Sequence, residues 1–187
     1  GTVTNYELVA RAKTGRKVPV SFNAAVFRDT AGQVVGILAA ARDITEQKRI
    51  ELELREQQSY TRSLIESNID ALMTTDPLGI ITDVNRQMCN ATGYTREELV
   101  GTPVKNYFTD PQRAEDAVRK VLAEDKITNY ELTILAKDGR QTVVSYNAAT
   151  FRDADGRLKG VFAAARDVTD QKLLEGQITQ RNRDLTE

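Results

Sequence analysis

Residues 128–172 read TNYELTILAKDGRQTVVSYNAATFRDADGRLKGVFAAARDVTDQK, and residues 4–48 read TNYELVARAKTGRKVPVSFNAAVFRDTAGQVVGILAAARDITEQK. The two stretches align without a gap at a constant offset of 124, and 27 of the 45 positions are identical. Chance does not produce such agreement, so the two segments share a fold. Residues 63–127 have no second copy in the sequence, so only the later half of the repeating unit occurs twice.

Each copy of the repeat reads as three strands separated by turns. In the second copy the strands are predicted at 129–136, 141–151 and 158–166, and in the first copy at 5–12, 17–27 and 34–42. Between the copies, 71–75 and 80–84 form a predicted hairpin around the turn DPLG at 76–79. Short helices are expected at 85–93 and 96–99, and a longer one follows Asp110, with Pro111 at its first position.

Composition excludes several classes of protein. The 187 residues include 26 Lys and Arg and 27 Asp and Glu, so the chain lacks the basic excess of a nucleic-acid surface. It has one cysteine and no histidine, which excludes a disulfide framework, histidine-ligated haem and catalytic triads that need histidine. No apolar run approaches the roughly 18 residues of a membrane span. We expect a soluble cytoplasmic protein that is not an enzyme, binds no nucleic acid and does not insert into a membrane.

Ordered motifs along residues 63–170 resemble those of PAS sensor domains. TDPLGII at 75–81 and TGYTREELVG at 92–101 resemble the front half of that fold, and KDG at 137–139, RDADG at 152–156 and RDVT at 166–169 resemble its back half. The resemblance implies an α+β PAS fold, with a five-stranded antiparallel sheet and short helices on one face around a small cavity. It also implies an input or coupling role in a histidine kinase, a cyclic-nucleotide enzyme or a similar receptor.

The resemblance and the repeat together predict four segments. Residues 1–45 are expected to form the C-terminal half of a PAS domain as a three-stranded meander, 46–62 a helical linker, 63–170 a complete PAS domain and 171–187 a C-terminal signalling helix. The short connection between 63–127 and 128–166 predicts that the front half pairs with 128–166 and not with 4–42. A meander with an open face and edge is marginal alone, so we expect a second copy to cover it, although a domain swap is an alternative.

Strand alternation and the family register place a set of mostly apolar residues on the inner face of the sheet. Both a cavity for a small apolar or aromatic ligand and a simple packed core fit this pattern. The flavin-attaching cysteine of light sensors would fall at Val104, so we expect no flavin adduct, no haem and no other cofactor; a non-covalent flavin stays open. The candidate pocket residues are Leu132, Ile134, Val144, Tyr146, Ala148, Val161, Ala163 and Ala165.

Three other polar or reactive positions were considered. Cys89 would be a reactive thiol if a cation such as Arg86 lowered its pKa, but a small buried hydrophobe is the favoured interpretation. Asn85 is interpreted as a turn or helix cap. Asn147 and its repeat partner Asn23 are expected to face outward from their sheets, with no chemistry implied.

The two polar segments after the repeats carry a weakened coiled-coil seam. A 4-3-4-3 spacing relates the residues Ile50, Leu54, Gln57, Thr61 and Leu64 in the first segment. The second segment follows the same pattern with Leu174, Ile178, Arg181 and Leu185. The apolar members, Ile50, Leu54, Leu64, Leu174, Ile178 and Leu185, predict a parallel dimer seam; the alternative is a solvated helix lying on its own domain. The polar members weaken the seam, which allows two packings of similar energy. Asp43, Thr45, Asp167 and Thr169 are expected to cap these helices and form the signal-transfer junctions.

The favoured function is a sensory or coupling module of a multidomain signalling protein, which passes conformational change through coiled-coil helices in a homodimer. The expected partners are a second copy, an effector domain such as a kinase in the parent protein and, as an option, a small apolar ligand. The alternative is a ligand-free module for dimerisation or protein interaction.

Overall fold

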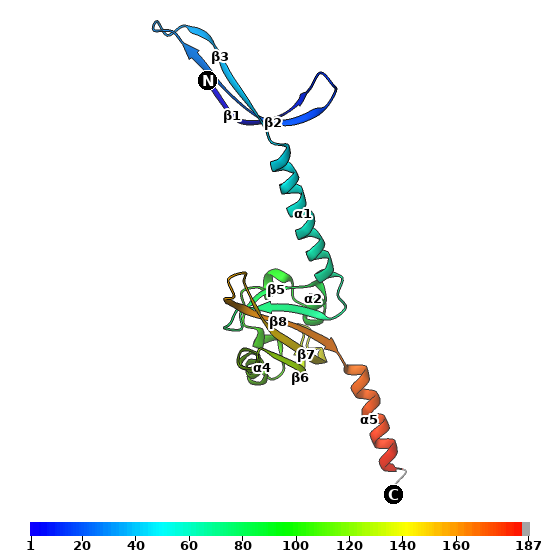
Figure 1. Cartoon of the computed structure of the whole chain (residues 1–187). Coiled ribbons are helices and arrows are strands. Elements are labelled where there is room, and N and C mark those ends of the chain that lie inside the picture. Colours follow the sequence, from blue (N-terminus) through cyan, green and yellow to red (C-terminus); the bar gives the residue numbers. More distant parts are fainter. Residues whose placement is uncertain (185–187) are drawn as a thin grey trace. The chain divides into compact units, whose positions relative to one another are not determined.

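The computed structural model describes residues 1–184 and divides the chain into two compact units, Gly1–Thr61 and Arg62–Glu187 (Figure 1). Each sheet lies within one unit: one has three strands and the other has five. The five-stranded sheet contains 71–75 and 158–167 as neighbours, so the front half pairs with the second copy of the repeat and not with the first. The predicted order of pairing is therefore confirmed.

The first unit is an antiparallel meander followed by a helix. Strands β1 (Thr2–Arg11), β2 (Lys17–Arg28) and β3 (Val34–Asp43) lie in the order β1-β2-β3, and α1 (Thr45–Glu66) begins directly after β3. Every residue of β1 is exposed, and α1 has no buried residue. The interior of this unit is therefore far smaller than that of the second unit.

The second unit contains an antiparallel sheet in the order β5-β4-β8-β7-β6. The strands are β4 (Ala71–Thr75), β5 (Ile81–Val84), β6 (Lys126–Leu135), β7 (Gln141–Arg152) and β8 (Leu158–Asp167). Between β5 and β6 the chain forms α2 (Arg86–Thr92), α3 (Arg96–Leu99), the 3-10 turn η1 (Val104–Tyr107) and α4 (Pro111–Glu124). α5 (Thr169–Asp184) follows β8.

The core of the second unit lies between its sheet and the helices α2 to α4. On α4 the apolar residues Ala114, Ala117, Val118 and Val121 recur at helical spacing and are buried. They pack with inner-face residues of the sheet such as Met73 in one continuous hydrophobic cluster. Within residues 1–184, no helix is both long and apolar enough to cross a bilayer.

The two copies of the repeat have the same backbone irregularity near the start of the first strand. Asn5 and Asn129 have φ angles of 52° and 53°, and each lies where the register with the next strand shifts. The amide nitrogen of Asn129 donates to Oδ1 of Asn147 at 2.8 Å, and that of Asn5 donates to Oδ1 of Asn23 at 2.7 Å. These asparagines therefore stabilise a β-bulge, a role that alternation alone does not indicate.

Candidate functional site

All eight predicted pocket residues lie in the hydrophobic cluster of the second unit. Each is between 0 and 6% exposed. Tyr146 is fully enclosed, and burial raises the pKa of its hydroxyl. The expected inner face is therefore a packed surface, while its use as a ligand pocket stays a prediction.

A small cavity opens at one end of this inner face. It has a volume of about 150 Å³ and is lined by Ile134, Val144 and Ala165 together with residues of α2 and the β8 end, among others. Ligand pockets for drug-sized molecules usually measure roughly 300–1,000 Å³. The cavity therefore has room only for a much smaller molecule.

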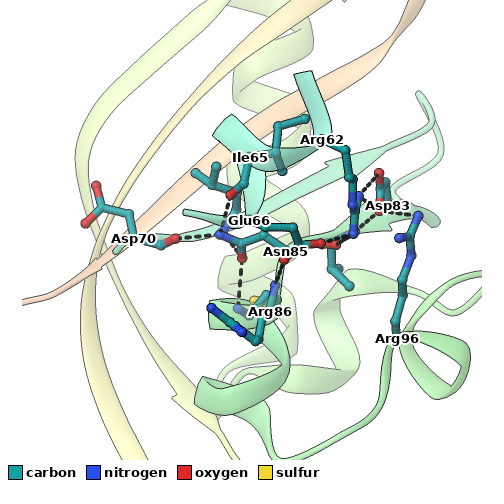
Figure 2. Close-up of polar contacts among 11 residues, drawn as sticks. Arg62, Ile65, Glu66, Asp70, Asp83, Asn85, Arg86 and Arg96 are labelled. Atoms are coloured by element: carbon teal, nitrogen blue, oxygen red, sulfur yellow. Dashed lines mark hydrogen bonds and ion pairs between the residues drawn. The ribbon is translucent and has the colours of Figure 1, made fainter. Parts of the chain in front are cut away.

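The last turn of α1 is bound to the core by a group of charged side chains (Figure 2). Asp83, at the end of β5, accepts from Arg62 at 2.9 Å and forms an ion pair with Arg96 at 2.8 Å. Arg62 also pairs with Glu66 on its own helix and donates to the carbonyl of Val84 at 3.2 Å. One carboxylate therefore joins α1 to α3 through two guanidinium groups.

Asn85 is the buried centre of the same junction (Figure 2). Its Oδ1 accepts from the backbone N–H groups of Leu72 and Met88, both at 2.9 Å, and it is the N-cap of α2. Its Nδ2 donates to the carbonyls of Ile65 at 3.3 Å and Asp70 at 3.0 Å. The cap interpretation is confirmed, but the side chain also binds the end of α1 and the start of β4.

A cleft of about 640 Å³ lies beside this junction, between the end of α1 and helices α2 and α3. Cys89 is part of its lining and is only partly buried. Burial, with the charges of Glu66 and Glu97, raises the pKa of the Cys89 thiol, whereas a reactive thiolate requires a lowered pKa. The structure therefore favours the interpretation of Cys89 as a small hydrophobe.

The start of α5 is bound to the sheet at a second junction. The Oδ1 atom of Asp167 accepts from the amide of Thr169 at 2.9 Å, and the Thr169 hydroxyl accepts from the amide of Val143 at 3.2 Å. Lys172, one turn into the helix, pairs with Glu131 of β6, which raises the pKa of the Lys172 amine. The first residues of α5 are therefore fixed to β6, β7 and β8.

The junction between β3 and α1 repeats this arrangement in the first unit. Asp43 accepts from the Thr45 hydroxyl at 2.6 Å and from its amide at 2.9 Å, and these hydrogen bonds lower the pKa of Asp43. Lys48 pairs with Glu7 of β1 at 2.8 Å. Both copies of the repeat therefore fix the helix that follows them by an equivalent cap and an equivalent ion pair.

One ion pair connects the two junctions of the second unit. Arg166, the residue before the α5 cap Asp167, donates through Nε and a terminal nitrogen to the Asp70 carboxylate at 3.3 and 3.2 Å. The carbonyl of the same Asp70 accepts from Asn85, which also binds the last turn of α1. A continuous set of polar contacts therefore runs from the end of α1 to the start of α5.

The predicted seam residues are exposed on their helices. Ile50, Leu54, Leu64, Leu174 and Ile178 belong to the large apolar residues at the surface, and Leu185 lies outside the described residues. Because these side chains are exposed, the helices do not use them to pack on their own units. The coiled coil itself stays a prediction.

The chain belongs to the PAS domain family. The family model matches residues 1–46 and 69–170, which together are most of the chain. The match covers the whole of the five-stranded sheet and also the meander of the first unit.

In the part of the chain that the structure describes, no group of three or more His, Cys, Asp or Glu residues is placed to hold a metal ion.

Curated relatives are much longer than this chain. A phytochrome of Pinus sylvestris is 28% identical over an alignment of 176 positions, which covers 86% of this chain and 16% of the relative. The signal transduction histidine-protein kinase AtoS of Escherichia coli (strain K12) is 25% identical over 130 residues, which are 70% of this chain and 21% of the kinase. The chain therefore corresponds to a small part of each of these proteins.

Solved structures agree with the fold. The PAS domain of an HTR-like protein from Haloarcula marismortui has a TM-score of 0.57 and 24% identity, and the match covers 64% of this chain and 98% of that domain. A PAS domain from Colwellia psychrerythraea has a TM-score of 0.53 and 24% identity, covering 63% and 98%. At these identities the similarity shows the fold alone.

Sequence reasoning missed the residues that join the helices to the core. Arg62 and Asp70 belong to no motif, and the RDVT motif that contains Arg166 indicated no partner for it. The contacts Arg62–Asp83, Asn85–Asp70 and Asp70–Arg166 join residues that lie 21, 15 and 96 positions apart. The repeat offered one signal, since Glu7 and Lys48 recur as Glu131 and Lys172. A search for charge pairs retained in both copies would have found that contact.

Proposed function

We propose that the chain is a sensory or coupling module that passes conformational change from α1 to α5 within a larger signalling protein. The observation that carries this proposal is the set of contacts from Arg62 and Ile65 through Asn85 and Asp70 to Arg166. A rotation or shift of α1 changes the geometry at Asn85, and the Asp70–Arg166 pair transmits it to the strand that enters α5. We assign the chain no enzymatic reaction of its own.

The proposed output is an effector domain such as a kinase, acting in a homodimer. The relative described as a signal transduction histidine-protein kinase supports this choice. The exposed apolar residues of α1 and α5 support dimerisation through the two helices, because the apolar seam residues that the structure describes are exposed on both helices. Two packings of such a seam with similar energies are sufficient for a switch.

The alternative function is a ligand-free module for dimerisation or protein interaction. The observation in its favour is the close packing of the inner face, where the candidate pocket residues are buried and the adjoining cavity measures about 150 Å³. A module of this kind needs its helices and its stable core, but it does not need a response of α5 to a change in α1. That response therefore separates the two functions.

The coupling is tested by changing α1 and observing α5 in the full chain. Arg62→Ala removes the bonds to Asp83, and we expect it to shift the amide NMR signals of Thr169 and Gln171 at the start of α5. We expect these shifts to disappear when Arg62→Ala is made in an Arg166→Ala background, because the Asp70 contact is then absent.

Arg42→Ala is the matched control. Arg42 is the repeat partner of Arg166 but makes no ion pair with any described residue, so the shifts at Thr169 and Gln171 should persist in that background. If Arg62→Ala leaves α5 unaffected, or if the response is unchanged without Arg166, the coupling proposal fails and the structural alternative is preferred.

A further inference from the structure

The meander of the first unit exposes the residues that its repeat copy buries. Leu8 is 41% exposed, whereas its partner Leu132 is 5% exposed. Ile37 is 68% exposed, whereas its partner Val161 is 1% exposed. In the second unit, this face is covered by the helices α2 to α4, and the edge of β8 is paired with β4; all of these elements come from Ile69–Asp125. The same apolar face therefore exists twice, and one copy has no cover among the described residues.

The uncovered sheet already has the backbone geometry of the covered one. Tyr6 opposes Phe22 as Tyr130 opposes Tyr146, and Ala24 opposes Ala39 as Ala148 opposes Ala163. The register shifts fall at equivalent positions in both sheets. A partner that fits β6–β8 therefore meets the same spacing of strands on β1–β3.

Gly36 points to a strand at the free edge of β3. Its repeat partner Gly160 lies where β4 approaches, and a Cβ atom there would be 1.7 Å from the carbonyl oxygen of Thr75. At Gly36 a Cβ atom would meet only the ring of Phe27, the movable end of a side chain, at 2.8 Å. At this position a side chain larger than that of glycine clashes with backbone only when a strand such as β4 lies beside it. The first copy of the repeat therefore has a glycine that the uncovered meander does not itself require.

The start of β1 also matches a front-half junction. In the second unit Asp125 ends α4, and its carbonyl accepts from the amide of Thr150 at 2.8 Å. Gly1, the partner of Asp125 at the repeat offset, accepts from the amide of Val26, the partner of Thr150, at 3.2 Å. The residue ahead of β1 therefore already lies where a helix equivalent to α4 would end.

The front half at Ile69–Asp125 cannot cover both sheets, because each chain contains only one such segment within residues 1–187. It covers β6–β8, and an exchange of front halves between two copies of the chain would again leave one meander open in each copy. A second complete chain could cover the face by sheet-on-sheet contact, which gives no reason for the glycine at position 36. It could also pair with β3 edge to edge, which leaves the apolar face uncovered. These points favour an additional front half over a second copy of this chain.

We propose that the inner face and free edge of β1–β3 bind a second PAS front half, with the chemistry of Ile69–Asp125, joined ahead of β1 in the same polypeptide. A strand equivalent to β4 pairs antiparallel to β3 beside Gly36. Helices equivalent to α2 and α4 cover Leu8, Phe22 and Ile37. The first unit is then the back half of a complete second module.

The test supplies this front half to the full chain. A copy of residues 69–124 is joined directly ahead of Gly1, and hydrogen exchange is measured for the amides of β3 in the native and the extended chain. We expect exchange at Ile37–Ala41 to slow by roughly 100-fold or more in the extended chain, because an open edge strand becomes an internal one. The amides of β8 report in the same spectra that the original module stays folded.

Gly36→Ala is the discriminating variant. In the extended chain its methyl group would clash with the added strand, so we expect the slow exchange of β3 to be lost. In the native chain the same variant should leave exchange at β3 unchanged. Equal exchange in the native and extended chains overturns the proposal. Slow exchange at β3 in the native chain that depends on its concentration, and that persists in the Leu54→Asp, Ile178→Asp variant without the helix seam, assigns the face to a second copy and also overturns the proposal.

Discussion

Asn85 shows how much one buried amide can organise. Its four hydrogen bonds reach the end of α1, the loop before β4, β4 itself and the start of α2. A shorter cap such as serine would keep the bond to Met88 but could not reach both carbonyls. The amide therefore serves as the common anchor of four backbone segments, and capping is only one part of its role.

Thr75 presents the opposite case at the residue scale. Its side-chain oxygen is buried and is the one such atom without a hydrogen-bond partner among the described residues. We expect Thr75→Val, which keeps the shape and removes the hydroxyl, to raise the free energy of unfolding by about 1 kcal/mol. Urea denaturation of the full chain measures this change. A loss of stability would mean that the hydroxyl has a partner, such as a bound water or ligand.

Glu98 gives a prediction for the acid side of the pH profile. The hydrogen bond from Lys137, followed by that from the Thr95 amide, lowers the pKa of Glu98. A carboxylate with a lowered pKa stabilises the fold at pH values above the pKa it has in the unfolded chain, and this contribution is lost as the pH falls through the lowered pKa of the folded state. We expect Glu98→Gln to reduce the fall in melting temperature between pH 5 and 3.

The neighbouring Glu97→Gln variant is the control for this measurement. Glu97 lies on the same helix but makes no hydrogen bond or ion pair with a described residue. The Glu97→Gln variant should show the same fall in melting temperature between pH 5 and 3 as the parent chain. If both substitutions reduced the fall in melting temperature equally, the pH dependence would arise from total charge and not from the contact between Glu98 and Lys137.

At the scale of elements, strands were easier to predict than the contacts that position helices. Alternation and turn residues placed β4, α3, α4 and the three strands of each repeat within a few residues, because these signals are local. β6 begins at Lys126, three residues ahead of the predicted start, because the bulge at Asn129 interrupts the alternation. The Asp70–Arg166 pair depends on which strands become neighbours, so no local pattern indicates it.

The helices α1 and α5 carry the prediction of dimerisation. Replacing both Leu54 and Ile178 by aspartate places charges at desolvated seam positions, at a cost of roughly several kcal/mol per dimer. We therefore expect sedimentation to show a monomer for this variant and a dimer for the parent chain.

Leu52→Asp combined with Leu173→Asp is the matched control. Both leucines are exposed on the same two helices but lie outside the 4-3-4-3 pattern. This pair should leave the dimer intact. A mass that is unchanged by the seam substitutions would remove the coiled coil from the proposed function.

At the scale of the whole molecule, the two sheets share no strand, and each is closed by connections within its own unit. We therefore expect deletion of residues 1–45 to leave the second unit folded, with a free energy of unfolding within about 0.5 kcal/mol of that in the full chain. Thermal unfolding followed by near-ultraviolet circular dichroism measures it. If the shortened chain is unfolded, the division into units is wrong.

The similarity of the two back halves also affects how the chain folds as it emerges from the ribosome. Of these three segments, β1–β3 leaves the ribosome before Ile69–Asp125, and β6–β8 leaves it last. At roughly 5–20 residues per second, translation of β6–β8 takes several seconds. During that time the nascent front half can pair with the meander only where no other front half covers β1–β3. A front half ahead of β1 occupies the meander before Ile69–Asp125 emerges, so vectorial synthesis prevents the mismatched pairing, whereas a complete chain diluted from denaturant offers both surfaces to both front halves at once.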